Sequence, residues 1–213
     1  MIKAFIFDMD GVIIDSEPLH FQSDKLVMKE FGIEISESEL MKFVGVTNPK
    51  MWTELIKIYN LGASVEELVE IQNKYKREIF GQGTLQAITG ILELISDLKE
   101  RNIRIGLASS SSRDFIEMVL KNLNIYDFFD IIISGEEVEN SKPAPDIFLK
   151  AAEGLGVKPC DCIVLEDSGH GVNAAKAAGM KCIAFKNPSS GNQDLSLADC
   201  LVCSLEKLNY MEI

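Results

Sequence analysis

The first eleven residues constrain the fold of this chain more than any other stretch. Four apolar residues in succession, Ala4 to Phe7, are followed by two acids, Asp8 and Asp10, and then by Gly11. A short apolar run of this kind predicts a strand that is buried on both faces of a parallel sheet. Ligands bind beyond the carboxyl ends of such strands, so the two acids are candidates for ligand contact. A D-x-D pair is equally consistent with a polar turn, and the rest of the chain has to distinguish the two interpretations.

Composition narrows the class of protein. A chain of 213 residues that is 46% hydrophobic can bury a core and carry a smaller inserted domain. A net charge of −12 argues against nucleic acid or an anionic membrane as a partner, because both need a positive face. No apolar run has the length of a transmembrane helix, and the sequence reaches Asp8 before a signal-peptide core forms. We therefore expect a soluble, cytoplasmic protein whose oligomeric state is open, with a monomer among the expected states.

Five cysteines, an odd number without a secretory signal, fit a reducing compartment. The pairs Cys160–Cys162 and Cys200–Cys203 raise zinc binding as an alternative. The second pair falls in a predicted strand over 199–202, where positions i and i+3 face opposite ways. The spacing therefore falls short of a closed four-ligand site, and buried free thiols are the preferred interpretation.

A block of helices follows the first strand. Helix starts are indicated by Ser16 ahead of a proline, by S-x-x-E capping boxes at Ser36 and Ser64, and by Asn48 ahead of a second proline. No strand pattern interrupts this block. We therefore expect residues 16–84 to form an inserted, all-helical cap, and residues 1–15 and 85–213 to form one α/β domain.

Helices and strands alternate from residue 90 onward. The predicted strands cover residues 103–108, 130–133, 163–165, 181–185 and, as a last short strand, 199–202. This alternation predicts a doubly wound parallel sheet with right-handed crossovers, which makes the fold class α/β. The helical block would then be a lid beside the edge of the sheet that carries the site.

Polar groups follow three of these strands and one loop. They are Asp8, Asp10, Ser109, Ser110, Lys142, Glu166 and Asp167. Because the ends of parallel strands share one edge, we expect these side chains to lie together. Oxygen ligands without His or Cys suit a hard cation such as Mg²⁺, which would also neutralise the four carboxylates. Lys142, Ser109 and backbone N–H groups are suited to hold a phosphoryl group beside the ion, which predicts a phosphoryl-transfer site.

The same residues resemble the four motifs of the haloacid dehalogenase-like superfamily. The motifs appear in order as Asp8-Met9-Asp10-Gly11-Val12, Ser109 after an apolar strand, Ser141-Lys142-Pro143-Ala144-Pro145-Asp146 and Leu165-Glu166-Asp167-Ser168. The similarity covers nearly the whole chain. Within the superfamily the chain is similar to the branch with a small helical cap that contains β-phosphoglucomutase and sugar-phosphate phosphatases. The resemblance implies a Rossmann-like core with that cap inserted.

The resemblance also implies a mechanism. Asp8 would attack phosphorus and form an aspartyl phosphate, while Asp10 would act as general acid and then as general base. Mg²⁺ would be held by Asp8, the backbone carbonyl of Asp10 and Asp167, with Glu166 as a direct or water-mediated ligand. The serine and the lysine of the two central motifs would bind phosphoryl oxygens. The expected activity is Mg²⁺-dependent hydrolysis of a small phosphorylated metabolite, with a sugar phosphate as the expected substrate.

Alternatives remain at single residues and for the activity itself. Ser109 has the alternative role of capping the next helix, although Ser111 and Ser112 are better placed for that. His20 matches a histidine of the β-phosphoglucomutase branch, with an ordinary helical position as the alternative. His170 is assigned no role.

The cap contains the main departure from the branch. Its mutases carry an Arg after a Gly-Val-Ser-like turn, whereas Asn48 follows Gly-Val-Thr here. Loss of the guanidinium favours hydrolysis over the alternative, a β-phosphoglucomutase-like phosphotransferase, although Lys50, Lys76 or Arg77 are candidate point charges. A non-catalytic metabolite-binding protein is the third interpretation, and the presence of both candidate catalytic aspartates speaks against it.

Overall fold

The computed structural model describes residues 2–44, 46, 48–82 and 85–212. Its contacts divide the chain into two compact units. The α/β unit consists of residues 1–15 and 85–213, and the helical unit consists of residues 16–84. The chain therefore leaves the α/β unit directly after the first strand and its turn, and returns at Leu85.

A six-stranded parallel sheet forms the centre of the α/β unit, in the order β3-β2-β1-β4-β5-β6. The strands are β1 (Ala4–Phe7), β2 (Arg104–Ser109), β3 (Ile131–Ser134), β4 (Cys162–Glu166), β5 (Lys181–Phe185) and β6 (Cys200–Val202). The predicted strands agree with these within one residue at each end. The expected fold class, a doubly wound parallel sheet, is confirmed.

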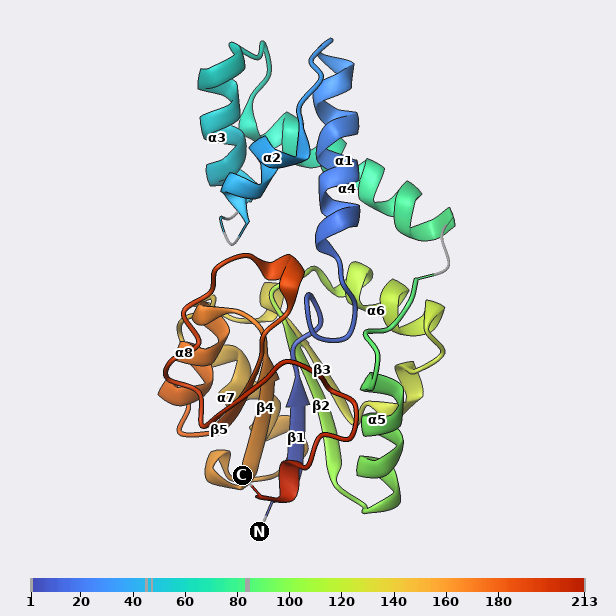
Figure 1. The fold of residues 1–213 in the computed structure, drawn as a ribbon, viewed down its shortest axis with the longest axis vertical. Coiled ribbons are helices and arrows are strands. Elements are labelled where there is room, and N and C mark those ends of the chain that lie inside the picture. The colour runs from blue at the N-terminus through green and yellow to red at the C-terminus, as the bar shows by residue number, and fades with distance from the viewer. Residues whose placement is uncertain (1, 45, 47, 83–84, 213) are drawn as a thin grey trace. The chain divides into compact units, whose positions relative to one another are not determined.

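β1 is buried on both faces, as its apolar sequence predicts. Ala4 and Ile6 belong to the core formed with α7 (Asp146–Leu155) and α8 (Gly169–Ala177), while Phe5 points to the other face and meets Tyr210 edge-on. Tyr210 also hydrogen-bonds to Asp97 of α5 (Ile91–Glu100). A further helix, α6 (Arg113–Asn122), packs near β3. Helices thus cover both faces of the sheet (Figure 1). Both faces of a parallel sheet are normally covered in this way.

The helical unit has its own hydrophobic core. It contains α1 (Glu17–Glu30), α2 (Glu37–Leu40), α3 (Asn48–Tyr59) and α4 (Val65–Gln82). The core surrounds Trp52, whose side chain is fully buried, and includes Met28 and Leu68. Apolar residues spaced along one face of each helix produce this arrangement, because only one side of a helix faces the core.

All four predicted helix starts of the helical unit agree with the structure. The capping box at Ser64 is confirmed by bonds in both directions with Glu67, at 3.2 and 2.8 Å, and Ser36 forms the corresponding backbone bond to its glutamate. α1 begins directly after Ser16, as the sequence predicts, but within the described residues the Ser16 side chain makes no capping bond. The helix that Asn48 opens is confirmed as α3, and Asn48 is itself its first residue. The neighbouring Gly45 and Thr47 lie outside the described residues.

The cysteines differ from the expectation of buried thiols. Cys162 and Cys182 are buried, and burial raises the pKa of each thiol to about 12. Cys160 and Cys203 are exposed, so the prediction is wrong for both, and Cys200 is half-buried. Cys160 lies in a 3₁₀ turn and Cys203 lies just after β6, where neighbouring elements no longer cover their thiols.

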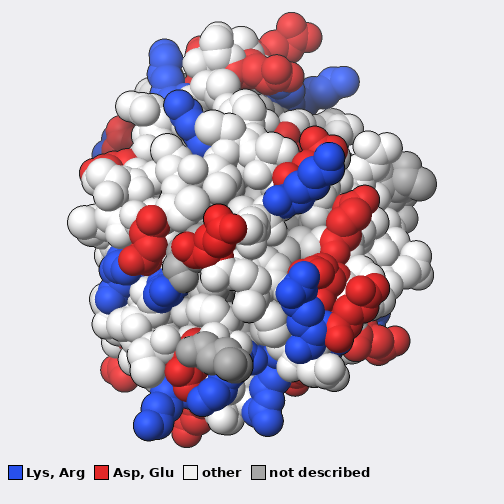
Figure 2. All heavy atoms as spheres, turned by 60° about the horizontal axis from the view of Figure 1, so that its bottom comes forward, with Lys and Arg blue, Asp and Glu red and all other residues white. Residues whose placement is uncertain are grey.

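The net charge of −12 and the lengths of the apolar runs predict that neither a membrane nor nucleic acid is a partner. None of the helices in the described part of the chain is both long and apolar enough to cross a membrane. On the face shown in Figure 2, Lys and Arg are interspersed with Asp and Glu.

Candidate active site

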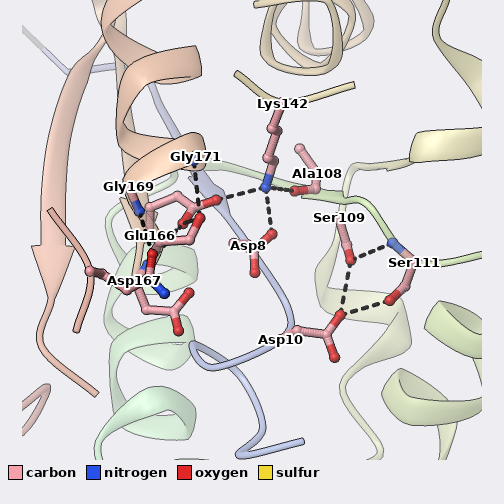
Figure 3. Close-up of polar contacts among 12 residues, drawn as sticks. Asp8, Asp10, Ala108, Ser109, Ser111, Lys142, Glu166, Asp167, Gly169 and Gly171 are labelled. Carbon is pink, nitrogen blue, oxygen red and sulfur yellow. Dashed lines mark hydrogen bonds and ion pairs between the residues drawn. The ribbon is translucent and has the colours of Figure 1, made fainter. Parts of the chain in front are cut away.

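The predicted polar residues meet at the carboxyl end of the sheet (Figure 3). Asp8 follows β1, and its backbone N–H donates to the carbonyl of Leu165 in β4 at 3.0 Å. Ser109 ends β2 and Glu166 ends β4, the two neighbours of β1. Because the register pairs Phe7 with both neighbouring strands, the residues that follow each strand are level with one another. Asp8 and Asp10 thus lie beside other predicted site residues, which favours a site over a mere polar turn, and their role stays a prediction.

Lys142 joins the acids of two strands. Its Nζ donates to Asp8 Oδ1 at 2.6 Å, to Glu166 Oε1 at 2.7 Å and to the carbonyl of Ala108 at 3.1 Å. These bonds use all three donors of an ammonium group. Burial opposes the charged form of this side chain, but the ion pairs with Asp8 and Glu166 outweigh burial and raise the pKa of Lys142 above its usual value. The lysine is therefore a fixed positive charge at the end of β1.

The acids outnumber this positive charge. Burial raises the pKa of Asp8 to about 8, and the neighbouring Glu166 and Asp10 act in the same direction against Lys142. The pKa of Asp167 is likewise raised well above its usual value. Burial is the largest cause, and the negative charges of Glu166 and Asp8 add to it. A further cation among these acids would keep both aspartates ionised.

Glu166 is held by protein donors on both oxygens. Oε1 accepts from Lys142, and Oε2 accepts from the backbone N–H of Asp167 at 2.9 Å and from the backbone N–H and hydroxyl of Ser168 at 2.8 and 2.9 Å. A Cβ on Gly171 would overlap the same carboxylate, so α8 approaches it closely. The geometry gives Glu166 the role of orienting Lys142, and direct contact with a metal stays a prediction.

Asp10 is held by serines that follow β2. Asp10 Oδ2 accepts from Ser111 Oγ at 2.7 Å, and Ser109 Oγ lies at 3.4 Å, a weak contact. Ser109 Oγ also accepts from the backbone N–H of Ser111 at 3.1 Å. Ser112 occupies the cap position of α6, so the alternative role of Ser109 as a helix cap falls to Ser112, one of the two serines expected to be better placed for it. Ser110 is exposed, and its contact with phosphate, like that of Ser109, stays a prediction.

Sequence reasoning missed Ser111 because four successive serines leave open which hydroxyl turns toward Asp10. It also missed Asn187 and Ser190, two buried residues in the loop after β5. A polar loop residue carries no pattern that separates buried from exposed, so no signal in the sequence identified them.

The donor set fits Mg²⁺. Asp8 and Asp167 supply carboxylate oxygens, and the neighbouring raised pKa values show a local excess of acid. In the ranges that the structure describes, no group of three or more His, Cys, Asp or Glu side chains is placed to hold a metal ion. Mg²⁺ is usually held by one or two carboxylates together with water and substrate phosphate, so an incomplete cage suits it.

The remaining predicted site residues belong to the helical unit. Asn48 opens α3, His20 lies in α1 and Lys76 lies in α4. The charges of Lys76 and His20 both act on Asp24, a buried acid of α1. His170, to which no role was assigned, is exposed at the start of α8. Contact of His20, Asn48 or Lys76 with substrate stays a prediction.

The fold and the site define a class of α/β protein with an aspartate pair after the central strand. A buried lysine contacts the first of the two aspartates, and a helical unit interrupts the chain just after that strand. A family model described as haloacid dehalogenase-like hydrolase matches residues 5–185. The chain belongs to this family, which confirms the expected family and the expectation of a hydrolase.

Curated relatives cover most of the chain. It is 36% identical over 218 residues to hexitol phosphatase B of Escherichia coli, covering 100% of this chain and 96% of the relative. It is 33% identical to a phosphorylated carbohydrates phosphatase of Thermotoga maritima, covering 85% and 84%. It is 37% identical to protein SUPPRESSOR OF QUENCHING 1, chloroplastic, of Arabidopsis thaliana, covering 89% of this chain but 18% of that much longer protein.

Solved structures share the fold over nearly the full length. β-Phosphoglucomutase from Clostridium difficile is 31% identical with a TM-score of 0.81, covering 100% of this chain and 95% of that one. A mutant of CbbY from Rhodobacter sphaeroides in complex with xylulose-(1,5)bisphosphate is 26% identical with a TM-score of 0.85, covering 98% and 97%. The likeness supports the β-phosphoglucomutase-like branch of the family.

Proposed function

We propose that this protein is a Mg²⁺-dependent phosphatase that hydrolyses a small phosphorylated metabolite, a sugar phosphate, through an aspartyl phosphate on Asp8. The observation that carries the proposal is the buried contact between Asp8 and Lys142 at the end of the central strand, with Asp10 two residues further on. A carboxylate fixed in this way beside a permanent cation is suited to attack a phosphoryl group whose charge the cation offsets.

In the first step Asp8 attacks phosphorus in line, and the bond from phosphorus to the leaving oxygen breaks. Asp10 donates a proton to that oxygen, which departs as an alcohol. In the second step Asp10 takes a proton from water, the water oxygen bonds to phosphorus, and the bond to Asp8 breaks. Inorganic phosphate leaves and both aspartates return to their starting state. The bond from Ser111 keeps the Asp10 carboxylate oriented in both steps.

Asp8, Asp167 and the backbone carbonyl of Asp10 are the ligands that we assign to Mg²⁺, with Glu166 acting through Lys142 or a bound water. The ion, when bound, would supply charge stabilisation for the transferring phosphoryl group. The substrate class rests on the names of relatives, among them a hexitol phosphatase and a phosphorylated carbohydrates phosphatase.

Asp8→Asn tests the proposal. We expect release of phosphate from p-nitrophenyl phosphate to fall by at least about 10³-fold, because an amide is no nucleophile. The variant should still fold, which its circular dichroism spectrum checks. Asp114→Asn, at an exposed position in α6, is the matched control and should keep full activity. Turnover by Asp8→Asn at the parent's rate would contradict the proposal.

A phosphotransferase like β-phosphoglucomutase is the second candidate, favoured by the solved neighbour of that name at 31% identity. The two candidates differ in whether water or a sugar hydroxyl accepts the phosphoryl group from Asp8. Incubation with β-glucose 1-phosphate and a bisphosphate primer distinguishes them, because formation of glucose 6-phosphate marks the mutase and release of inorganic phosphate marks the phosphatase.

A further inference from the structure

The loop that follows β5 contains buried polar residues outside all four motifs of the site. Asn187 precedes a short 3₁₀ turn, Pro188–Ser190. The side chains of Asn187 and Ser190 are each only 6% exposed. Loop side chains of these types are normally exposed, and burial of a polar group is costly unless it is hydrogen-bonded. The hydrogen-bond partners of these two residues therefore indicate the role of the loop.

Asn187 is bonded to the turn that carries Asp10. Its Nδ2 donates to the carbonyl of Gly11 at 3.0 Å, and its Oδ1 accepts from the backbone N–H of Ser189 at 2.9 Å. The N–H of Gly11 donates in turn to the carbonyl of Ile14 at 2.8 Å. Gly11 has a φ of +77°, which favours glycine. Both polar backbone groups of the residue after Asp10 are thus fixed.

Ser190 is bonded to Asp167. Its Oγ donates to Asp167 Oδ2, and a Cβ on Gly11 would overlap the same carboxylate. The carbonyl of Ser190 accepts from Gln193 Nε2 at 2.8 Å, and Gln193 Oε1 accepts from the N–H of Gly169 at 3.1 Å. The loop is therefore tied to the start of α8 as well as to the acid before it.

A third bond from the same turn reaches the end of the first segment. Ser189 Oγ donates to Asp15 Oδ2 at 2.7 Å, and Asp15 is the last residue of the chain before the helical unit. One short loop thus contacts the Asp10 turn, Asp167 and Asp15, which come from two different strand ends. Such bonds restrict the directions in which the two acids can point.

We propose that Asn187 and Ser190 are positioning residues for phosphoryl transfer, Asn187 holding Asp10 through the Gly11 carbonyl and Ser190 holding the carboxylate of Asp167. This inference rests on the proposed function. Neither residue touches the reacting atoms, and each acts through the residue that it contacts.

The role of Ser190 is tested by direct metal binding rather than by activity. Mn²⁺ replaces Mg²⁺ as the probe, and the electron paramagnetic resonance signal of free Mn²⁺ gives the dissociation constant. Ser190→Ala should weaken Mn²⁺ binding by about 10-fold, because an outer partner of a metal-binding carboxylate typically contributes that much. Ser190→Cys, of similar size with a weaker donor, gives a second measurement if Ser190→Ala does not fold. Ser196→Ala, at an exposed position of the same loop region, is the control and should bind as the parent does.

The role of Asn187 is tested by its dependence on the leaving group. Asn187→Asp keeps the size of the side chain but replaces the donor to Gly11 by an oxygen, which would repel the carbonyl and shift Asp10. A nitrophenolate leaves without protonation, whereas a sugar alkoxide needs the proton from Asp10. We expect kcat/KM for glucose 6-phosphate to fall about 10-fold more than kcat/KM for p-nitrophenyl phosphate. Asn192→Asp, with the same change of charge at an exposed position, should leave the ratio unchanged.

The outcomes separate this inference from the proposed function. Parent-like Mn²⁺ affinity in a folded Ser190→Ala or Ser190→Cys protein, or an unchanged leaving-group ratio in Asn187→Asp, overturns the corresponding assignment. If the parent binds Mn²⁺ but hydrolyses neither phosphate ester, the proposed function fails while the Mn²⁺ titration still decides the role of Ser190. If the parent does not bind Mn²⁺, the assignment of Ser190 is overturned.

Discussion

At the scale of single residues, Lys142 determines the charge balance of the site. Its three bonds connect the end of β1 with the ends of β2 and β4, and its side chain is 7% exposed. A buried ion pair is costly to break, because removal of one partner leaves the other charge without compensation. The same contact therefore contributes both to stability and to the proposed chemistry.

Lys142→Met should abolish phosphatase activity and lower the free energy of unfolding by about 3 to 5 kcal/mol, the usual effect of breaking a buried pair. Urea denaturation followed by circular dichroism gives the stability, and release of phosphate gives the activity. Lys150→Met removes a lysine that lies on the surface and donates to the carbonyl of Glu137, and it should change both quantities little. Equal stability of Lys142→Met and Lys150→Met would show that the buried pair contributes nothing.

At the scale of elements, the turn from β4 into α8 is the most crowded part of the site. Gly171 lies in the first turn of α8, where the helix backbone meets the carboxylate of Glu166. Ser168 caps this helix by accepting from the N–H of Gly171 at 3.0 Å, and it also donates to Glu166. The start of α8, the carboxylate of Glu166 and Lys142 are therefore coupled through a close contact at Gly171 that only glycine allows.

Gly171→Ala tests this coupling. Alanine is favoured over glycine in helices by roughly 1 kcal/mol. Here the added Cβ would displace Glu166, and such overpacking costs about 1 to 3 kcal/mol. We expect a net loss of stability in urea denaturation and a loss of activity, because the displaced glutamate no longer holds Lys142. Gly62→Ala, where a Cβ meets no atom within 4 Å, should not lose stability in this way. If Gly171→Ala were more stable than the parent and fully active, the expected clash between its Cβ and Glu166 would be contradicted.

At the scale of the whole molecule, the two units have separate cores and separate buried polar contacts. In the helical unit, Gln72 of α4 donates to Asp24 of α1 at 2.5 Å. Burial raises the pKa of Asp24, and the bond from Gln72 and the charges of Lys76 and His20 only partly offset this. The folded state therefore binds the proton of Asp24 more tightly than the unfolded state. It follows that this acid costs stability as the pH rises above its unfolded pKa of about 3.9.

Asp24→Asn should stabilise the helical unit at neutral pH, because the amide oxygen still accepts from Gln72 while the buried charge is gone. The gain should shrink as the pH falls and vanish below about 3.9, where the carboxyl of the parent becomes protonated in both the folded and the unfolded state. Hydrogen exchange measured by mass spectrometry should locate the gain in α1 and α4. Asp194→Asn should instead lower the stability at neutral pH, because the Ser196 hydrogen bonds favour the ionised carboxylate and hold the pKa of Asp194 below its usual value. A gain that is independent of pH would contradict this account.

Much of the fold followed from local patterns. Short apolar runs located the strands, and S-x-x-E boxes located two helix starts, because burial and capping act over a few neighbouring residues. The alternation of strands and helices was enough for the sheet class. The helix start after Ser16 was also located, but the Ser16 side chain makes no capping bond within the described residues, since such a bond depends on backbone angles that the residue type does not fix.

The sequence by itself determined which residue types stand at the strand ends, and hence the family, the acid pair and the lysine of the site. Only the tertiary structure decided which hydroxyls serve those acids: Ser111 rather than its neighbours turns to Asp10, and Ser190 reaches Asp167. The physical reason is distance along the chain. Ser111 lies 101 residues from Asp10 and Ser190 lies 23 from Asp167, so these bonds exist only once the sheet aligns the loops that carry them.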